Sequence, residues 1–94
     1  MATLSIKHQV ADFDDWKKVF DGHATVRQQH SATGHRVYRD LADPTEIVIH
    51  TDFVSREAAE KFLADPWLAE AMAEAGVVNE PTITFLECAE DLEY

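Results

Sequence analysis

The stretch Asp12–Ser31, DFDDWKKVFDGHATVRQQHS, determines how the rest of the chain must be arranged. Drawn as a helix at about 100° per residue, it separates apolar side chains from charged and amide side chains. The apolar face is formed by Phe13, Trp16, Val19, Phe20 and Val26. The spacing therefore predicts one amphipathic helix over 12–31, and another layer of the protein must cover its apolar face.

The centre of that apolar face is polar. His23 and Arg27 project beside Trp16, and His30 lies close to them. An imidazole and a guanidinium lose hydration on burial unless they find a partner, and a cavity is the simplest relief. We therefore predict a pocket on this face, with His23 and Arg27 as its polar groups. The alternative is that Arg27 bridges to an acidic side chain while His23 bonds a backbone carbonyl.

The segments on either side of this helix predict three strands. Thr3–Val10 alternates, with His8 on its apolar face, as a half-buried strand does. Gly34 is expected to end the helical segment, and strands are expected over His35–Leu41 and Glu46–Phe53. Between these two strands, Asp43-Pro44-Thr45 predicts a turn because proline cannot extend a ladder.

A second helical region and a last strand complete the pattern. Ser55 is a typical first cap, and Asp65-Pro66 restarts the helix because proline suits its first position. Gly76 ends the helix, and Thr82–Cys88 alternates as a strand. The order β-α-β-β-α-β predicts an α+β, ferredoxin-like fold, with a four-stranded antiparallel sheet and helices on one face.

The second face of this sheet is mixed in character. Val48, Leu86 and Tyr38 are poor choices for an open surface, so we expect two copies to close their sheets as a homodimer. Ninety-four residues provide for one domain over 1–94, with a solvated acidic tail from about residue 89.

Charge and cysteine content exclude several classes of partner. The 18 acidic and 8 basic residues give a net charge of −10, which disfavours nucleic acid and membrane surfaces. Cys88 is the single cysteine and no signal-peptide core is present, so we expect a cytoplasmic protein. The histidines lack metal-ligand spacing, so neither a metal nor an organic cofactor is predicted.

Three stretches resemble small bacterial proteins of the dimeric α/β-barrel superfamily, which are similar to antibiotic-biosynthesis monooxygenases and are often labelled cyclases. The stretches are VADFDDWKKVFDGH, YRDLADPTEIVIHTDF and FLADPWLAEAMAEAGVVNEPTITFLE. The resemblance implies a dimeric α/β barrel with a ligand between the sheet and the helices. The haem-degrading branch is disfavoured, since no histidine follows His50 and the first strand has no asparagine.

The predicted function is that of an enzyme acting on an aromatic or polyketide-like enol, by oxygenation or cyclisation. His23 would be the base, with His8 as its substitute, and Arg27 would stabilise the anion. The residues expected to contact a small apolar or aromatic ligand are Trp16, Phe20, His30, Thr51, Trp67 and Met72. A non-catalytic dimeric binding protein using the same pocket is the alternative, and a third possibility is that no pocket exists.

Overall fold

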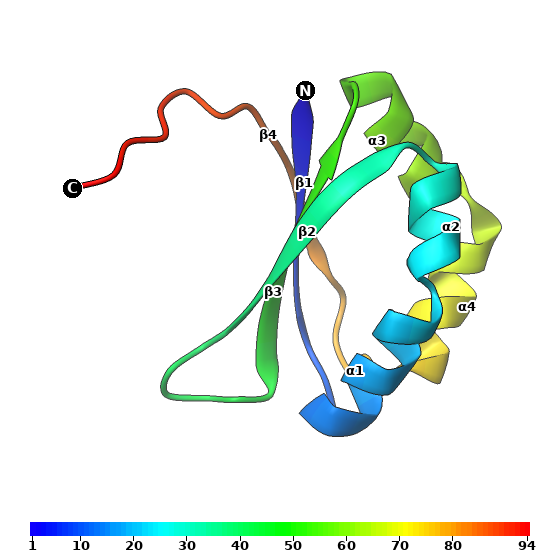
Figure 1. Ribbon diagram of the computed structural model, residues 1–94. Helices are drawn as coiled ribbons and strands as arrows, with labels where there is room; N and C mark the ends of the chain where they lie inside the picture. Colours follow the sequence, from blue (N-terminus) through cyan, green and yellow to red (C-terminus); the bar gives the residue numbers. More distant parts are fainter.

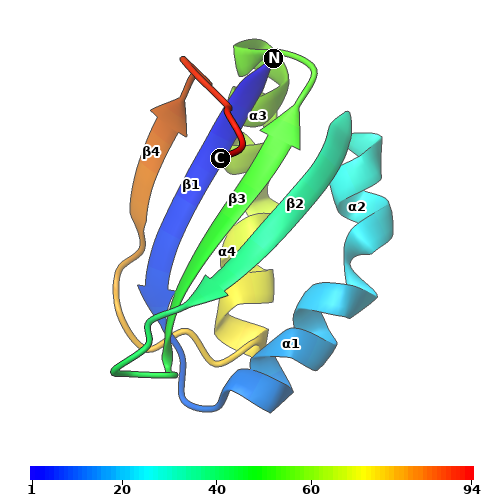
Figure 2. The same cartoon turned by 60° about the vertical axis from the view of Figure 1, so that its left-hand side comes forward.

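The computed structural model describes residues 1–94 and contains one four-stranded antiparallel sheet. The strand order is β2-β3-β1-β4, and helices cover one face only (Figure 1). The strands are β1 (Ala2–Gln9), β2 (Ala32–Arg39), β3 (Glu46–Phe53) and β4 (Thr82–Leu86). Figure 2 looks onto the open face of the sheet, with the helices behind it. The predicted ferredoxin-like fold is confirmed.

The helix layer consists of two interrupted helices. Its elements are α1 (Phe13–Gly22), α2 (Ala24–Gln29), α3 (Arg56–Ala64) and α4 (Pro66–Glu74). Three side chains cap helix starts as predicted: Asp12 accepts from the Asp15 N–H, Ser55 from Ala58, and Asp65 from Trp67. Gly76, which has φ +82°, follows the end of α4 in the left-handed conformation that glycine tolerates.

Two predicted boundaries near the first helix are wrong. The helix over 12–31 is broken at His23, whose φ of −106° and ψ of 17° leave the helical region. The preceding Gly22 has a low helix propensity, and the His23 N–H bonds the Phe20 carbonyl at 3.2 Å, which tightens the last turn. Gly34 does not end the helix, because Ser31 reverses the chain with φ 65° and Gly34 lies inside β2 at a register shift.

The ends of three strands also differ from the prediction. β2 runs from Ala32 to Arg39 rather than from His35 to Leu41. β1 stops at Gln9, and Val10 makes only an isolated bridge to Val77. β4 ends at Leu86 rather than Cys88, since its pairing with β1 ends where Leu86 meets Thr3. Residues 87–94 form no helix or strand and are exposed. None of the helices is long and apolar enough to cross a membrane.

The buried core is divided into two clusters between the sheet and the helices. One contains Leu4, Ile6, Phe53, Ala59 and Phe62, beneath α3. The other contains Val10, Trp16, Ile47, Ile49 and Ala75, beneath α1 and the end of α4. Side chains of both clusters face the same space between them, an apolar cavity that we call the main cavity.

Candidate functional site

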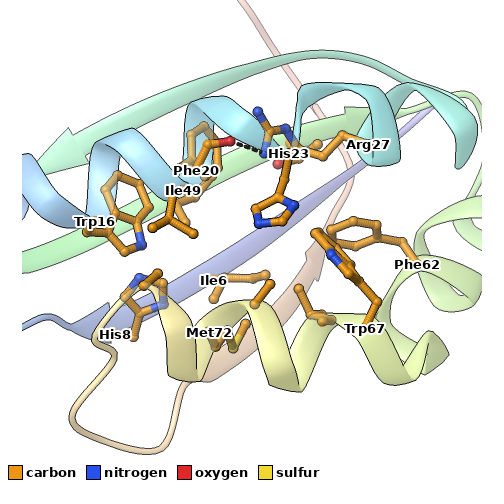
Figure 3. Close-up of a pocket in the computed structure, with 15 residues that line it drawn as sticks. Ile6, His8, Trp16, Phe20, His23, Arg27, Ile49, Phe62, Trp67 and Met72 are labelled. Carbon is orange, nitrogen blue, oxygen red and sulfur yellow. Dashed lines mark hydrogen bonds between the residues drawn. The ribbon is translucent and has the colours of Figure 1, made fainter.

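The main cavity lies between the sheet, the α1–α2 pair and α4, with walls that are mostly apolar (Figure 3). Its volume is about 60 Å³. The possibility that side chains fill this space completely is therefore excluded. Eight of the predicted site residues line it: His8, Trp16, Phe20, His23, Arg27, Thr51, Trp67 and Met72.

His8 is the most unusual group in the cavity wall. It projects from β1 with 2% of its surface exposed, and neither ring nitrogen has a hydrogen-bond partner. Its ring meets that of Trp16 edge-on, with 5.9 Å between the centroids. Burial lowers the pKa of His8, because the charged imidazolium would lose its hydration. The imidazole is thus neutral at pH 7, with a free lone pair inside an apolar enclosure.

His23 and Trp67 approach one another from the two interrupted helices, α1–α2 and α3–α4. His23 occupies the break between α1 and α2, and Trp67 lies just after the break between α3 and α4. Their rings meet edge-on at 4.9 Å between centroids (Figure 3). His23 Nε2 also lies 4.0 Å from a carboxylate oxygen of the exposed Glu74. Both helix interruptions therefore place a ring at the same part of the cavity.

Arg27 is a buried cation without a carboxylate partner. Only 6% of it is exposed, and its Nη1 donates to the Phe20 carbonyl at 2.8 Å. Its guanidinium carbon lies 3.8 Å from the centroid of the Phe20 ring. Burial lowers the pKa of Arg27, although nearby Asp21 partly offsets this effect. Neither partner foreseen for the non-functional alternative, an acidic side chain for Arg27 or a carbonyl for His23, is found.

Aromatic rings form one wall of the cavity. Trp16 and Phe20, one helical turn apart on α1, stack with 4.9 Å between centroids. Met72 of α4 faces them across the cavity, and an unbranched thioether adapts readily to a ring-shaped ligand (Figure 3). This arrangement places flat apolar walls beside one neutral base.

His30 is the predicted contact that the structure does not bring to the cavity. Its Nε2 lies 2.9 Å from Asp65 Oδ2, and its ring packs edge-on against Phe62. The interaction ties the end of α2 to the α3–α4 junction and lowers the pKa of Asp65. His30 faces away from the cavity because this carboxylate holds it.

Sequence reasoning missed the aliphatic part of the wall and one polar neighbour. Ile6, Ile49 and Leu68 line the cavity, although their pattern is that of ordinary core residues. His35, expected at the start of the second strand, was not predicted as a site residue; it lies exposed on β2, with 5.0 Å between the centroids of its ring and that of Phe20. His35 pairs with the predicted site residue Thr51 across β2 and β3, so the register of these two strands was the signal that could have located it. No group of three potential metal-ligating side chains occurs in the structure.

Comparison with known proteins gives a consistent fold assignment. No family model matches the chain, and no curated protein matches it in sequence. Among solved structures it is similar to SnoaB, a cofactor-independent oxygenase from Streptomyces nogalater. The TM-score is 0.78 and the identity 14%, over 99% of this chain and 97% of that one.

Two further structures share the fold. The ActVA-Orf6 monooxygenase of Streptomyces coelicolor, solved in complex with nanaomycin D, has a TM-score of 0.69 and 16% identity over 99% of this chain and 91% of that one. A Deinococcus radiodurans protein assigned to the antibiotic biosynthesis monooxygenases has a TM-score of 0.72 and 18% identity, covering 100% of this chain and 98% of that one. The chain has the fold of these proteins, and the predicted structural resemblance is confirmed.

Proposed function

We propose that this protein is an enzyme that acts on a phenolic or enolic aromatic compound by acid–base chemistry in the main cavity. The observation that carries the proposal is His8, a neutral imidazole whose nitrogens have no partner inside an apolar enclosure. A buried polar group without a hydrogen bond costs about 1–3 kcal/mol, so its retention requires a reason. A ligand hydroxyl would supply the missing partner.

The proposed reaction begins with transfer of the substrate's hydroxyl or α-carbon proton to His8. The resulting phenolate or enolate is electron-rich, and Arg27 supplies the positive charge that stabilises it. Dioxygen can then oxidise a ring CH₂ group to a carbonyl. One oxygen atom becomes the carbonyl oxygen, and the other leaves as water with the two hydrogens. Ring closure is the alternative outcome. The neutral His8 has a lone pair free to accept this proton, with His23 in a supporting position where the α1–α2 pair meets the α3–α4 pair.

The size of the cavity requires movement on binding. A volume of about 60 Å³ holds a few water molecules, whereas a cavity of about 150 Å³ is needed for a single benzene ring. A ligand would separate the rings of His23 and Trp67, because this contact joins the α1–α2 pair to the α3–α4 pair. The fold neighbours support the proposal through their described activities, cofactor-independent oxygenation and monooxygenation.

The test is turnover of a panel of hydroxynaphthalenes and anthrones, followed by oxygen uptake and by mass spectrometry of the products. We expect His8→Leu to reduce turnover by about 10²–10⁴-fold, the usual contribution of a positioned base. His50→Leu is the matched control, since His50 pairs with Ser5 on the face of the sheet away from the cavity.

The same panel distinguishes catalysis from binding. Stabilisation of the fold by a ligand without any turnover would make the protein a non-catalytic binding protein. Unchanged turnover in His8→Leu would remove His8 from the mechanism. A panel that neither reacts nor binds would overturn the proposal.

A further inference from the structure

A second, polar hollow lies beside the main cavity, between α2 and β2. Its volume is about 130 Å³. Three small residues, Ala24, Ala32 and Gly34, leave it open, and the polar side chains around it are Arg27, Gln28, Thr33, His35 and Thr51. Arg27 and Thr51 line both hollows, so the two adjoin at these side chains. We call this hollow the α2–β2 chamber.

Arg27 is the buried cation of the chamber, and it forms no salt bridge with a carboxylate, although Asp21 is near enough to act on its pKa. Its one hydrogen bond to the protein is the one from Nη1 to the Phe20 carbonyl. By contrast, the exposed Arg36 and Arg56 each lie 2.9 Å from a carboxylate oxygen. A buried ion is stabilised only when it is paired and its donors are satisfied.

The absence of a carboxylate at Arg27 is informative because this chain is rich in carboxylates. It has 18 acidic residues, yet none forms an ion pair with the one arginine that is buried. A guanidinium carries several N–H donors in a planar fork, and one carbonyl cannot satisfy them. The remaining donors are available to a bound anion.

The neighbours of Arg27 suit a small anion. Thr51 is buried and Gln28 provides a neutral donor in the lining of the chamber, whereas the Thr33 hydroxyl donates to the Asp52 carbonyl at 3.4 Å. Burial, and then the charge of Arg27, lower the pKa of His35, so its neutral ring can donate one hydrogen bond at pH 7. The chamber therefore presents one full positive charge surrounded by uncharged donors.

We propose that the α2–β2 chamber binds the carboxylate group of the substrate, whose aromatic body occupies the main cavity. This inference rests on the proposed function and names its substrate class, an aromatic phenol or enol that carries a carboxylate. A planar carboxylate matches the guanidinium fork and its single charge. A phosphate dianion would keep an unpaired charge here, on a chain whose net charge is −10.

The experiment compares two probes of similar ring size, 1-hydroxy-2-naphthoate and 1-naphthol. Binding is followed by the fluorescence of the cavity tryptophans, Trp16 and Trp67. We expect the wild-type protein to bind the carboxylate probe at least about tenfold more tightly, a charge-assisted preference of about 1.4 kcal/mol. Equal affinity for the two probes would overturn the proposal.

Variants then locate the preference. Arg27→Met should remove the preference for the carboxylate probe over 1-naphthol, because it removes the charge and keeps the apolar stem. Arg56→Met is the matched control, since Arg56 is exposed and pairs with Glu60. Loss of affinity for both probes to the same extent in Arg27→Met would contradict the assignment.

A second variant keeps the test valid if Arg27→Met does not fold. Ala24 is exposed, lines the chamber and precedes Arg27 by one helical turn, so Ala24→Asp would place an internal carboxylate near the guanidinium. We expect Ala24→Asp to weaken 1-hydroxy-2-naphthoate by about tenfold or more, while the neutral Ala24→Asn leaves it unchanged. Identical behaviour of the two variants would count against the chamber.

Two outcomes separate this inference from the proposed function. A carboxylate preference that depends on Arg27, without turnover, supports the chamber and removes the enzyme. Turnover of hydroxynaphthalenes without that preference leaves the enzyme and removes the chamber. Inorganic phosphate is the third probe, and its displacement of 1-hydroxy-2-naphthoate at equal concentration would reject the carboxylate assignment.

Discussion

The His8 imidazole is expected to support activity and to lower the stability of the fold. Its nitrogens are unpartnered, and its neighbours two residues away on either side are the buried Ile6, on β1, and Val10, just after β1. Leucine has a similar volume and no polar atoms to desolvate. We therefore predict that His8→Leu raises the free energy of unfolding by about 1 kcal/mol while it removes turnover.

Urea denaturation of the wild-type protein and the variant measures this change. His8→Asn is the control, because its amide would still be buried without partners and should not stabilise the fold. A loss of stability of about 1 kcal/mol or more in His8→Leu would show that the imidazole is held by hydrogen bonds with internal water.

The buried histidine also predicts how stability depends on pH. Because the pKa of His8 is lower in the folded protein than the ordinary value of 6.5, the unfolded chain binds more protons below that value. The contribution of neutral His8 is therefore complete above about pH 6.5 and is lost as the pH falls towards the folded pKa. Unfolding free energies between pH 7.5 and 5 should decline less steeply in His8→Leu.

His35 gives the comparison for this measurement. Its pKa is also lowered, but it is exposed, so His35→Leu should flatten the pH dependence less than His8→Leu. Parallel curves for the wild-type protein and His8→Leu would contradict the prediction.

At the scale of elements, the two helix interruptions differ in how well the sequence predicts them. The break before α4 is marked by Asp65-Pro66, since proline cannot continue a helix and aspartate caps the next one. The break at His23 has only Gly22 before it, and a single glycine is common inside helices. The apolar face continues through both α1 and α2, so periodicity alone predicts one helix.

Asp65 connects three elements and should be more important than an ordinary cap. It caps α4 through the Trp67 N–H and holds His30 at the end of α2. We predict that Asp65→Ala lowers the free energy of unfolding more than Asp12→Ala does, because Asp12→Ala loses a cap alone. Urea denaturation measures both.

A double-mutant cycle tests the His30 component of this effect. The losses in Asp65→Ala and His30→Ala should not add in the double variant, because the two groups form one hydrogen bond. The pKa of Asp65 lies below its usual range, so its contribution should be lost as the pH falls below about 3.8. Strict additivity would contradict the proposed link between α2 and α4.

For the whole molecule, the pattern of apolar and polar residues along each strand and helix predicts the fold, but it does not determine the cavity. Alternation and caps are local properties, and they suffice for the strand and helix order. Ile6, Ile49 and Phe62 line the cavity. Whether such residues touch one another or enclose a space depends on how far the helices lie from the sheet and from each other. Polar residues on an apolar face were the local sign of the space, and His8, His23 and Arg27 all line it.

The open face of the sheet is the surface that we expect a second copy to cover. Three of its polar groups are already paired, since Asp52 accepts from Thr3 at 2.7 Å and from Arg36 at 2.9 Å. This pairing allows burial without an isolated charge. Around it lie the half-buried Val48 and the partly exposed Tyr38 and Leu86, at 46% and 38%. The helix-free face is therefore suited to a homodimer interface.

Light scattering after size-exclusion chromatography tests this prediction. At micromolar concentration we expect about twice the 10.6 kDa mass of the chain. Val48→Glu should shift the protein to monomer, because it buries an unpaired charge at the centre of the interface. Val54→Glu is the control, since Val54 is exposed beside α3 and should leave the dimer intact. A wild-type monomer, or equal effects of the two variants, would place the interface elsewhere or remove it.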